Sequence, residues 1–174
     1  NGIAPWLSIN LDFSPKDATE TAILNQFDDI CAGYKYSIEA PNELIHCGDV
    51  EGAEHEIEHY AGCDTVFVAG NNDFFSNFPS EKTLQIGKYR VMITHGHRYY
   101  IGMGNEMLKE EAIAQGMDIV MYGHTHKPVI DISDNIVAIN PGSLSYPRQE
   151  NRRPSYIIME IDEAGEAHFS LHFV

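Results

Sequence analysis

Short runs of mostly apolar residues recur along this chain, and four of them end at a glycine-containing polar motif. Runs of this length, bounded by turn residues, are typical of strands that are buried within a sheet. The pattern therefore predicts four buried strands, at residues 44–47, 65–69, 89–94 and 119–122.

Helical spacing of apolar residues follows a predicted first strand at residues 6–12. Ser14 fits the N-cap of a helix, with Pro15 at the first helical position. Two more helices are predicted at residues 51–61 and 105–115. The first helix would turn four apolar side chains toward the core, namely Ile23, Phe27, Ile30 and Tyr34.

The carboxyl-terminal third has a different pattern, in which pairs of apolar segments flank short polar turns. It predicts two antiparallel hairpins. Their strands would span residues 129–132 with 136–139, and residues 156–162 with 167–173. Together the elements predict a single α/β domain over residues 1–174, folded as a layered α/β sandwich of mixed sheets flanked by helices.

Polar motifs follow the predicted strands in a fixed order. Because open α/β folds place their ligands at the carboxyl ends of strands, these motifs are expected to meet at one edge. The motifs are His46-Cys47-Gly48-Asp49, Gly70-Asn71-Asn72-Asp73, Thr94-His95-Gly96-His97, Tyr122-Gly123-His124-Thr125-His126 and Asn140-Pro141-Gly142-Ser143.

The residue types in these motifs point to a two-metal site. Such a site needs a bridging carboxylate, for which Asp49 is the natural candidate, together with further oxygen and nitrogen ligands. Asn71 offers an amide oxygen. His95, His124 and His126 offer imidazoles, which suit Mn, Zn, Ni or Fe.

The ordered series resembles the calcineurin-like metallophosphoesterase superfamily, in particular its small YfcE-like phosphodiesterases, from about Leu44 to the carboxyl end. The resemblance implies a phosphodiesterase or phosphatase that hydrolyses a small phosphate ester by means of a metal-bound hydroxide. Two divalent ions are implied, most simply manganese, with nickel, zinc and iron left open. The implied catalytic residues are Asp49, Asn71, His95 and His97, and the implied metal ligands are Asp12, Asp49, Asn71, His95, His124 and His126.

Two departures from the family pattern affect this interpretation. The family carries Asp-x-His after its first strand, whereas the best match here is Asp12-Phe13-Ser14, and serine is a poor metal ligand. Many superfamily members also have a histidine where Asn72 stands, and an amide cannot donate a proton as an acid. The second hypothesis is therefore a catalytically weak scaffold for protein interaction, because the retromer scaffold subunit shares the fold and also departs from Asp-x-His.

A second metal motif, His55-Glu56-Ile57-Glu58-His59, matches the His-Glu-x-x-His pattern of zinc proteases. On a helical wheel Ile57 and Tyr60 share one face, while His55 and His59 lie opposite. We therefore expect these histidines to face solvent rather than a closed zinc site.

Several loop residues near the motifs allow two interpretations. Arg148 is either an exposed side chain or a bidentate contact to a phosphate oxygen. Asp73 either orients a neighbour or caps its loop. The aromatic residues after the Asn motif are expected to anchor their loop, with an apolar wall for a substrate as the alternative; they are Phe74, Phe75 and Phe78.

The net charge of the chain limits the kinds of binding partner that we expect. The chain has 26 acidic and 11 basic residues, and its net charge is -15. Such a chain repels phosphate backbones, so we expect a small phosphoester substrate and no broad nucleic-acid binding. Three cysteines imply no disulfide framework, and no apolar run reaches the roughly 20 residues of a membrane span. We expect a cytoplasmic protein with no membrane partner; a homo-oligomer is left open.

Overall fold

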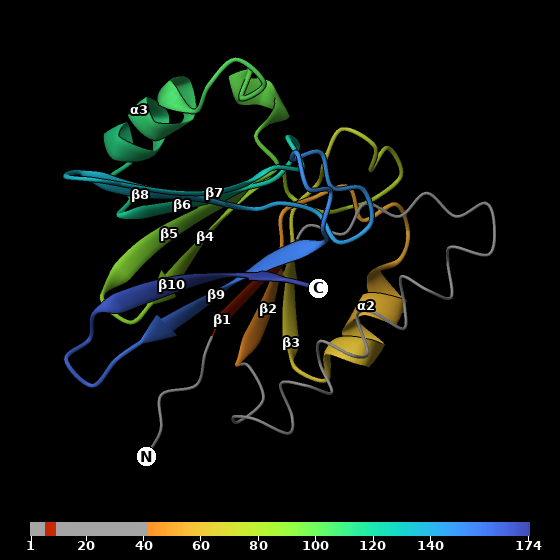
Figure 1. Cartoon of the computed structure of the whole chain (residues 1–174), viewed down its shortest axis with the longest axis horizontal. Helices are drawn as coiled ribbons and strands as arrows, with labels where there is room; N and C mark the ends of the chain where they lie inside the picture. Colours follow the sequence, from red (N-terminus) through yellow and green to blue (C-terminus); the bar gives the residue numbers. More distant parts are fainter. Residues whose placement is uncertain (1–5, 10–41) are drawn as a thin grey trace.

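Two mixed five-stranded sheets lie face to face in the computed structural model, which describes residues 6–9 and 42–174 (Figure 1). The first sheet has the order β10-β9-β1-β2-β3 and the second the order β4-β5-β6-β8-β7. The first is built from β1 (Trp6–Ile9), β2 (Glu43–His46), β3 (Asp64–Phe67), β9 (Ser155–Ile161) and β10 (Ala167–Phe173). The second is built from β4 (Glu81–Ile86), β5 (Tyr89–Thr94), β6 (Ile119–Tyr122), β7 (Pro128–Ser133) and β8 (Ile136–Pro141).

Each sheet has a parallel centre with antiparallel strands at its margin. In the first sheet β1, β2 and β3 run parallel, while β9 pairs antiparallel with β1 and with β10. In the second sheet β5, β6 and β8 run parallel, with β4 and β7 antiparallel at the edges. The parallel strands of each sheet therefore end at a common edge, and the polar motifs follow them there.

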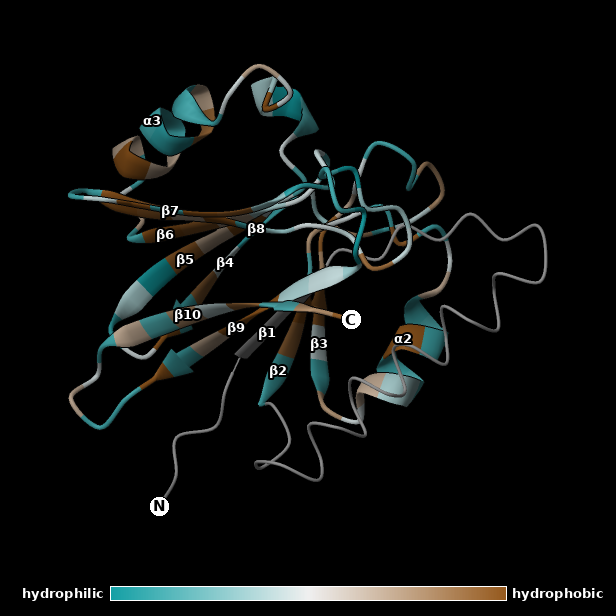
Figure 2. Ribbon diagram, in the orientation of Figure 1, coloured by the Kyte–Doolittle hydropathy of each residue, from teal (hydrophilic) through white to brown (hydrophobic). Residues whose placement is uncertain are grey.

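The helices complete a four-layer arrangement. Helix α2 (Glu54–Ala61) covers the outer face of the first sheet, and helix α3 (Glu106–Ala114) covers the second (Figure 1). Each sheet can pack on both of its faces, because successive residues of a strand point to opposite faces of the sheet. Leu44 faces α2 while Ile45 faces the other sheet, and Val120 faces α3 while Ile119 faces inward. Apolar colour accordingly concentrates along the strands in Figure 2.

The predicted fold class and both carboxyl-terminal hairpins are confirmed. Helix α2 begins at Glu54 rather than at Glu51, because Glu51 and Gly52 have φ angles of 51° and 86°, which no α-helix contains. Strand β4 was not predicted, since its exposed, partly charged residues mask the alternation of Leu84 and Ile86. A short 3₁₀ helix, His97–Tyr99, was also not predicted.

Part of the amino-terminal prediction lies outside the described residues. Strand β1 covers the first part of the predicted strand, whereas the helix expected after Ser14 is not among the residues described. Within residues 6–9 and 42–174, no helix combines the length and the apolar character needed to cross a membrane.

Candidate metal centre

The loops after β2, β3, β5 and β6 bring four of the predicted site residues together around one ring nitrogen. His95 Nε2 lies 3.3 Å from Asp49 Oδ2, 3.1 Å from Asn71 Oδ1 and 3.2 Å from His124 Nδ1. Asp49 and His95 are buried, His124 is half-buried and Asn71 is exposed. A buried carboxylate and imidazole thus sit at the base of a cluster whose outer side is open to solvent.

The tautomer of His95 explains why this cluster needs a cation. His95 Nδ1 lies 2.8 Å from the carbonyl oxygen of Cys47, which can only accept, so Nδ1 carries the proton. In the neutral ring, Nε2 then points a lone pair at the oxygens of Asp49 and Asn71. Lone pairs facing one another are stable only with a cation, either a proton or a metal ion, among them.

His126 is oriented in the same way as His95. Its Nδ1 lies 2.9 Å from the carbonyl oxygen of Tyr146, and its side chain is buried. Metal-binding histidines usually donate their second ring N–H to a carbonyl or carboxylate, which fixes the ring for ligation. The orientation of both rings therefore matches that of metal ligands.

The donor chemistry fits a transition metal, although the ligand set is not complete in the described residues. Within them, no three His, Cys, Asp or Glu side chains form a ready metal-binding group by themselves. The cluster includes the amide oxygen of Asn71 as a further donor. One carboxylate, one amide oxygen and imidazoles are ligands that manganese, iron, nickel and zinc accept. The remaining predicted ligand, Asp12, lies outside the described residues.

The backbone is strained at three of the predicted ligands. Asp49, His124 and His126 have φ angles of 59°, 64° and 57°, in the left-handed region that side-chain-bearing residues seldom adopt. Such conformations cost of the order of 1–3 kcal/mol each and cluster at functional sites. The loops therefore hold these three predicted metal ligands in strained backbone conformations.

Two glycines allow these loops to approach each other. A Cβ atom added at Gly70 would lie 2.0 Å from Asp49 Oδ1, and one added at Gly48 would lie 2.7 Å from His95 Nδ1. Neither distance is compatible with a side chain. The two loops can therefore meet around Asp49 only because these positions are glycine.

Asp73 connects the loops that carry Asp49 and Asn71. Its carboxylate accepts hydrogen bonds from the backbone N–H groups of Asp49 at 2.8 Å, Glu51 at 2.7 Å and Gly70 at 2.7 Å. Both interpretations of this residue were partly right, since it caps its own loop and also positions a predicted ligand. Its three partners lie in two separate loops, which the local sequence could not reveal.

Asn140 performs a similar task for the loop that carries His124. Its Nδ2 donates to the carbonyl oxygen of Gly123 at 2.7 Å and to Thr125 Oγ1 at 3.1 Å, on either side of His124. Its Oδ1 accepts from the N–H of Gly142 at 2.9 Å. The Asn-Pro-Gly-Ser motif thus ends strand β8 and also supports the candidate metal centre.

Burial and charge shift the protonation of the central groups. Burial alone would raise the pKa of Asp49, but the hydrogen bond and charge of His95, the N–H of Asn72 and the charge of His124 together hold it below its usual range. Burial, and next the charge of His95, lower the pKa of His124 and of His97. The carboxylate is therefore charged and the two imidazoles neutral at pH 7, which are the forms that bind metals.

His97 lies beside the cluster rather than within it. Its ring centroid is 5.4 Å from that of His95 and 6.2 Å from that of His124. Its Nδ1 is buried and has no hydrogen-bond partner among the described residues. This placement leaves His97 beside the candidate donors, with a buried ring nitrogen that no described residue contacts through a hydrogen bond.

The histidines of the second metal motif face solvent, as predicted. His55 and His59 are exposed on helix α2, whereas Ile57 is buried beneath it. His55 Nδ1 lies 3.6 Å from Glu58 Oε2 of the same helix. Helix α2 therefore holds no closed zinc site.

The aromatic loop after Asn71 and Asn72 differs in part from its prediction. Phe78 anchors the loop, with its ring stacked on Phe67 at 5.1 Å between centroids. Phe74 and Phe75 are 79% and 101% exposed, so the expectation that they also act as anchors is wrong. The hydrogen bonds of Asp73 and the ring of Phe78 hold this loop, so it needs no anchoring by Phe74 and Phe75.

Comparisons with known proteins agree with the geometry. The family model of the calcineurin-like phosphoesterase superfamily domain matches residues 30–164. The probable metallophosphoesterase YsnB of Bacillus subtilis is 34% identical over 119 residues, which cover 68% of this chain and 68% of that protein.

Two solved structures share the fold. A predicted phosphoesterase from Streptococcus pneumoniae superposes with a TM-score of 0.74 at 23% identity, covering 98% of this chain and 88% of the other. Vps29 of Entamoeba histolytica, solved with zinc, superposes with a TM-score of 0.73 at 19% identity, covering 97% and 98%.

Proposed function

Because this chain belongs to the calcineurin-like phosphoesterase superfamily, we propose that it is a divalent-metal-dependent phosphodiesterase that hydrolyses a small phosphate ester. The observation that supports this most directly is the meeting of Asp49, Asn71 and His124 around the Nε2 atom of His95. Asp49, Asn71, His95 and His124 would hold one ion, while Asp49, His126 and Asp12 would hold the other.

Bound divalent ions would supply positive charge for the phosphate oxygens and would activate the attacking water. Manganese is our first choice, with nickel, zinc or iron as alternatives, because the donor types suit all four. The metal identity and a cytoplasmic location remain predictions from the sequence.

The protein's own residues have distinct tasks in this proposal. The lowered pKa of Asp49 keeps both of its oxygens available as ligands. The N–H of Asn72 donates to Asp49 Oδ1 at 2.9 Å and fixes the carboxylate, while His97 would contact a phosphate oxygen. The side chain of Asn72 is an amide that also contacts Asp49, at 3.2 Å, and cannot protonate a leaving group. This favours diesters with good leaving groups.

The direct test of the proposed function is to replace Asp49, the carboxylate proposed to bridge the two ions. Asp49→Asn should lower turnover of bis(p-nitrophenyl) phosphate by more than about 100-fold, because losing even an outer partner of a metal ligand costs about 10- to 100-fold. Metal content by elemental analysis should fall together with turnover, while the circular dichroism spectrum stays the same. Asp134→Asn, in the exposed turn between β7 and β8, is the matched control. Unchanged turnover in Asp49→Asn would remove Asp49 from the bridge.

A catalytically weak scaffold is the second candidate. The missing Asp-x-His motif favours it, as do the exposed Tyr100, Met103 and Met107, which could form an interaction surface. The likeness to Vps29 at 19% identity extends to the fold alone. Metal stoichiometry and turnover measured in one preparation separate the candidates, since a scaffold would bind metal without hydrolysing the diester.

A further inference from the structure

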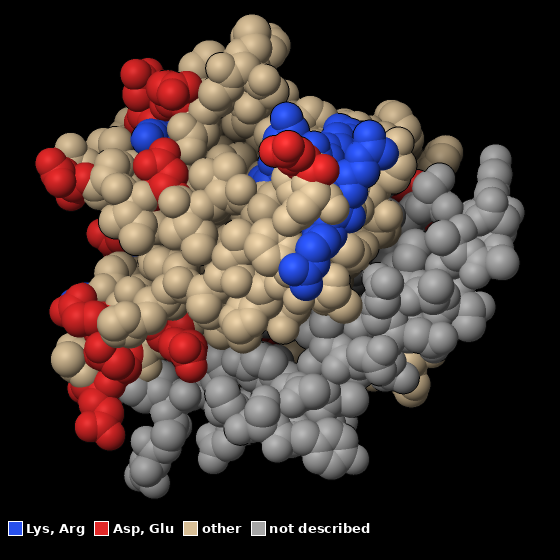
Figure 3. Space-filling view, viewed as in Figure 1, with Lys and Arg blue, Asp and Glu red and all other residues tan. Residues whose placement is uncertain are grey.

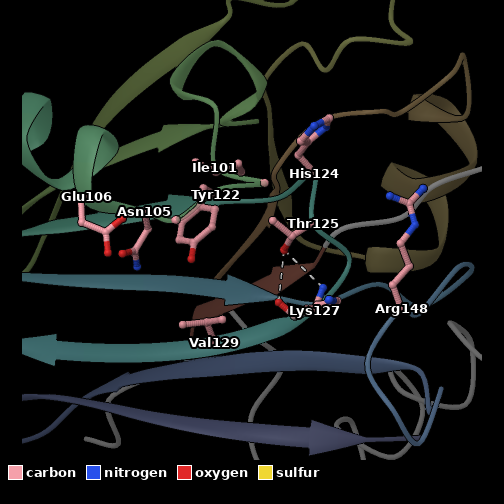
Figure 4. Close-up of a pocket in the computed structure, with 11 residues that line it drawn as sticks. Ile101, Asn105, Glu106, Tyr122, His124, Thr125, Lys127, Val129 and Arg148 are labelled. Atoms are coloured by element: carbon pink, nitrogen blue, oxygen red, sulfur yellow. Dashed lines mark hydrogen bonds between the residues drawn. The ribbon is translucent and has the colours of Figure 1, made fainter.

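A cavity of about 500 Å3 adjoins the candidate metal centre and has His124 in its wall. Figure 4 shows Asn105 and Glu106 at one end of the cavity and His124 and Arg148 toward the other. Its size lies in the range of about 300 to 1,000 Å3 that is usual for small-molecule sites. A substrate held at the metal centre could extend into this space.

The end of the cavity near His124 is basic. Lys127 and Arg148 both line it. Two other lysines have carboxylate partners: Lys88 lies 2.6 Å from Glu166, and Lys109 lies 2.9 Å from Asp131. Across the described part of the chain, no carboxylate forms an ion pair with Lys127 or Arg148. On the face seen in Figure 3, most of the basic side chains gather in one patch, apart from most of the acidic ones.

Both cations are attached to the loops that present the metal donors. The backbone N–H of Arg148 donates to the carbonyl oxygen of His126 at 2.9 Å, and its guanidinium lies 5.3 Å from the ring centroid of Tyr146. Lys127 directly follows His126 in the sequence. The backbone positions of the two residues are thus set relative to the candidate metal centre.

The basic surface continues past the cavity. Arg148 and Arg152 also line an adjacent hollow of about 410 Å3, together with Tyr146. A ligand group at this end would therefore meet positive charge on more than one side. In a chain of net charge -15, this local excess of positive charge calls for an anionic ligand.

We propose that the cavity, with Lys127 and Arg148, is an anion pocket that binds a second negatively charged group of the substrate. The substrate is then a phosphodiester that carries a further phosphate or carboxylate on the part that is not the leaving group. This inference rests on the proposed function and adds the substrate class to it. The inference is carried by two cations beside the candidate metal donors, neither of which forms an ion pair with a carboxylate of residues 6–9 or 42–174.

The test compares two chromogenic diesters with the same leaving group, thymidine 5′-(p-nitrophenyl phosphate) and its 3′-phosphorylated form. The 3′-phosphate should lower KM by about tenfold, the effect of one charge-assisted hydrogen bond. Lys127→Gln and Arg148→Gln should each reduce this preference to less than about twofold. Lys88→Gln, which changes a lysine in the turn after β4, should keep it.

Two outcomes would overturn the anion pocket while leaving the phosphodiesterase proposal in place. One is an equal KM for both diesters in the unmodified protein. The other is an equal loss for both diesters in Lys127→Gln or Arg148→Gln, which would place these cations on the scissile phosphate.

A different result would separate the two proposals. If neither diester is hydrolysed, the proposed function fails, and the pocket is tested by calorimetric binding of thymidine 3′,5′-bisphosphate with manganese present. Binding that is about tenfold weaker in Lys127→Gln and in Arg148→Gln, but unchanged in Lys88→Gln, would support the pocket. Equal binding by all variants would overturn it.

Discussion

Asp49 depends on its immediate neighbours for both its position and its charge. Its N–H is held by Asp73, its oxygens accept from Asn72, and its carboxylate contacts His95. Gly70 packs so closely against it that no side chain fits there. A small change at any of these positions should therefore act on metal binding through Asp49.

Gly70→Ala tests this dependence. A Cβ atom would lie 2.0 Å from Asp49 Oδ1 and 2.3 Å from its backbone N, so the two loops must move apart. We expect a loss of roughly 1–3 kcal/mol in the free energy of unfolding, as for other overpacked sites, and a loss of metal affinity. Urea denaturation and metal titration measure the two effects.

Gly102→Ala is the control for this substitution, because no atom of the described residues, apart from its two chain neighbours, lies within 4 Å of an added Cβ. Metal affinity that stays the same in Gly70→Ala would show that the approach to Asp49 does not matter for binding.

A second prediction at the scale of single residues concerns the histidine that is missing from the Asp-x-His motif. If Asp12-Phe13-Ser14 takes the place of that motif, the ion assigned to Asp12, Asp49 and His126 has fewer protein ligands than its partner. We expect one tight and one weak metal site by titration calorimetry, and tighter binding in Ser14→His. Two equally tight ions in the unmodified protein would mean that another residue supplies the ligand.

At the scale of single elements, polar contacts decide where helices begin and how they are held. Helix α2 starts late because the N–H of Glu51 is bonded to Asp73 in a left-handed backbone conformation. Helix α3 is tied to β7 through Asp131, which accepts hydrogen bonds from Lys109 at 2.9 Å and from Asn105 at 3.0 Å. The contacts of Asp131 predict that the stability of the protein depends on pH.

The hydrogen bonds from Lys109 and then Asn105 hold the pKa of Asp131 below its usual range. Stability from a lowered carboxylate pKa is present above the unfolded value of about 3.9 and is lost as the pH falls through the folded value. The gap in unfolding free energy between the unmodified protein and Asp131→Asn should stay constant above about pH 5 and close below about pH 4.

The gap should be under about 1 kcal/mol, because the pair is near the surface. Urea midpoints at several pH values measure it, with Asp134→Asn as the exposed control. A gap that does not narrow as the pH is lowered from about 5 toward about 2 would assign the effect to something other than ionisation.

At the scale of the whole molecule, charge opposes folding. With 26 acidic and 11 basic residues, the chain repels itself at neutral pH. On the face seen in Figure 3 most of the basic side chains gather in one patch, so they offset little of the repulsion among the acidic side chains on the other side of that face.

Salt should therefore stabilise the protein. Raising NaCl from 10 to 150 mM shortens the screening length from about 30 to about 8 Å. We expect the melting temperature at pH 7 to rise by a few degrees, and to change little at pH 5, near the isoelectric point of about 4.8. Scanning calorimetry of the metal-free protein measures both. An equal rise at the two pH values would point to a general salt effect rather than to charge repulsion.

The sequence by itself determined the buried strands, the two carboxyl-terminal hairpins, the fold class and the order of the polar motifs. These depend on local signals, since an apolar run that ends at a glycine turn is written in a few adjacent residues. The family resemblance added the ligand set, which stays a prediction.

Only the tertiary structure decided how the motifs meet. Asp73 bonds to Asp49 and Glu51, more than 20 positions earlier in the chain, and Asn140 supports the loop around His124 from 15 and 17 positions away. The tertiary structure also decided that Phe74 and Phe75 face solvent, and that Lys127 and Arg148 share one cavity. These facts depend on contacts between loops of different strands, which local patterns do not encode because the loops become neighbours only when both sheets have formed.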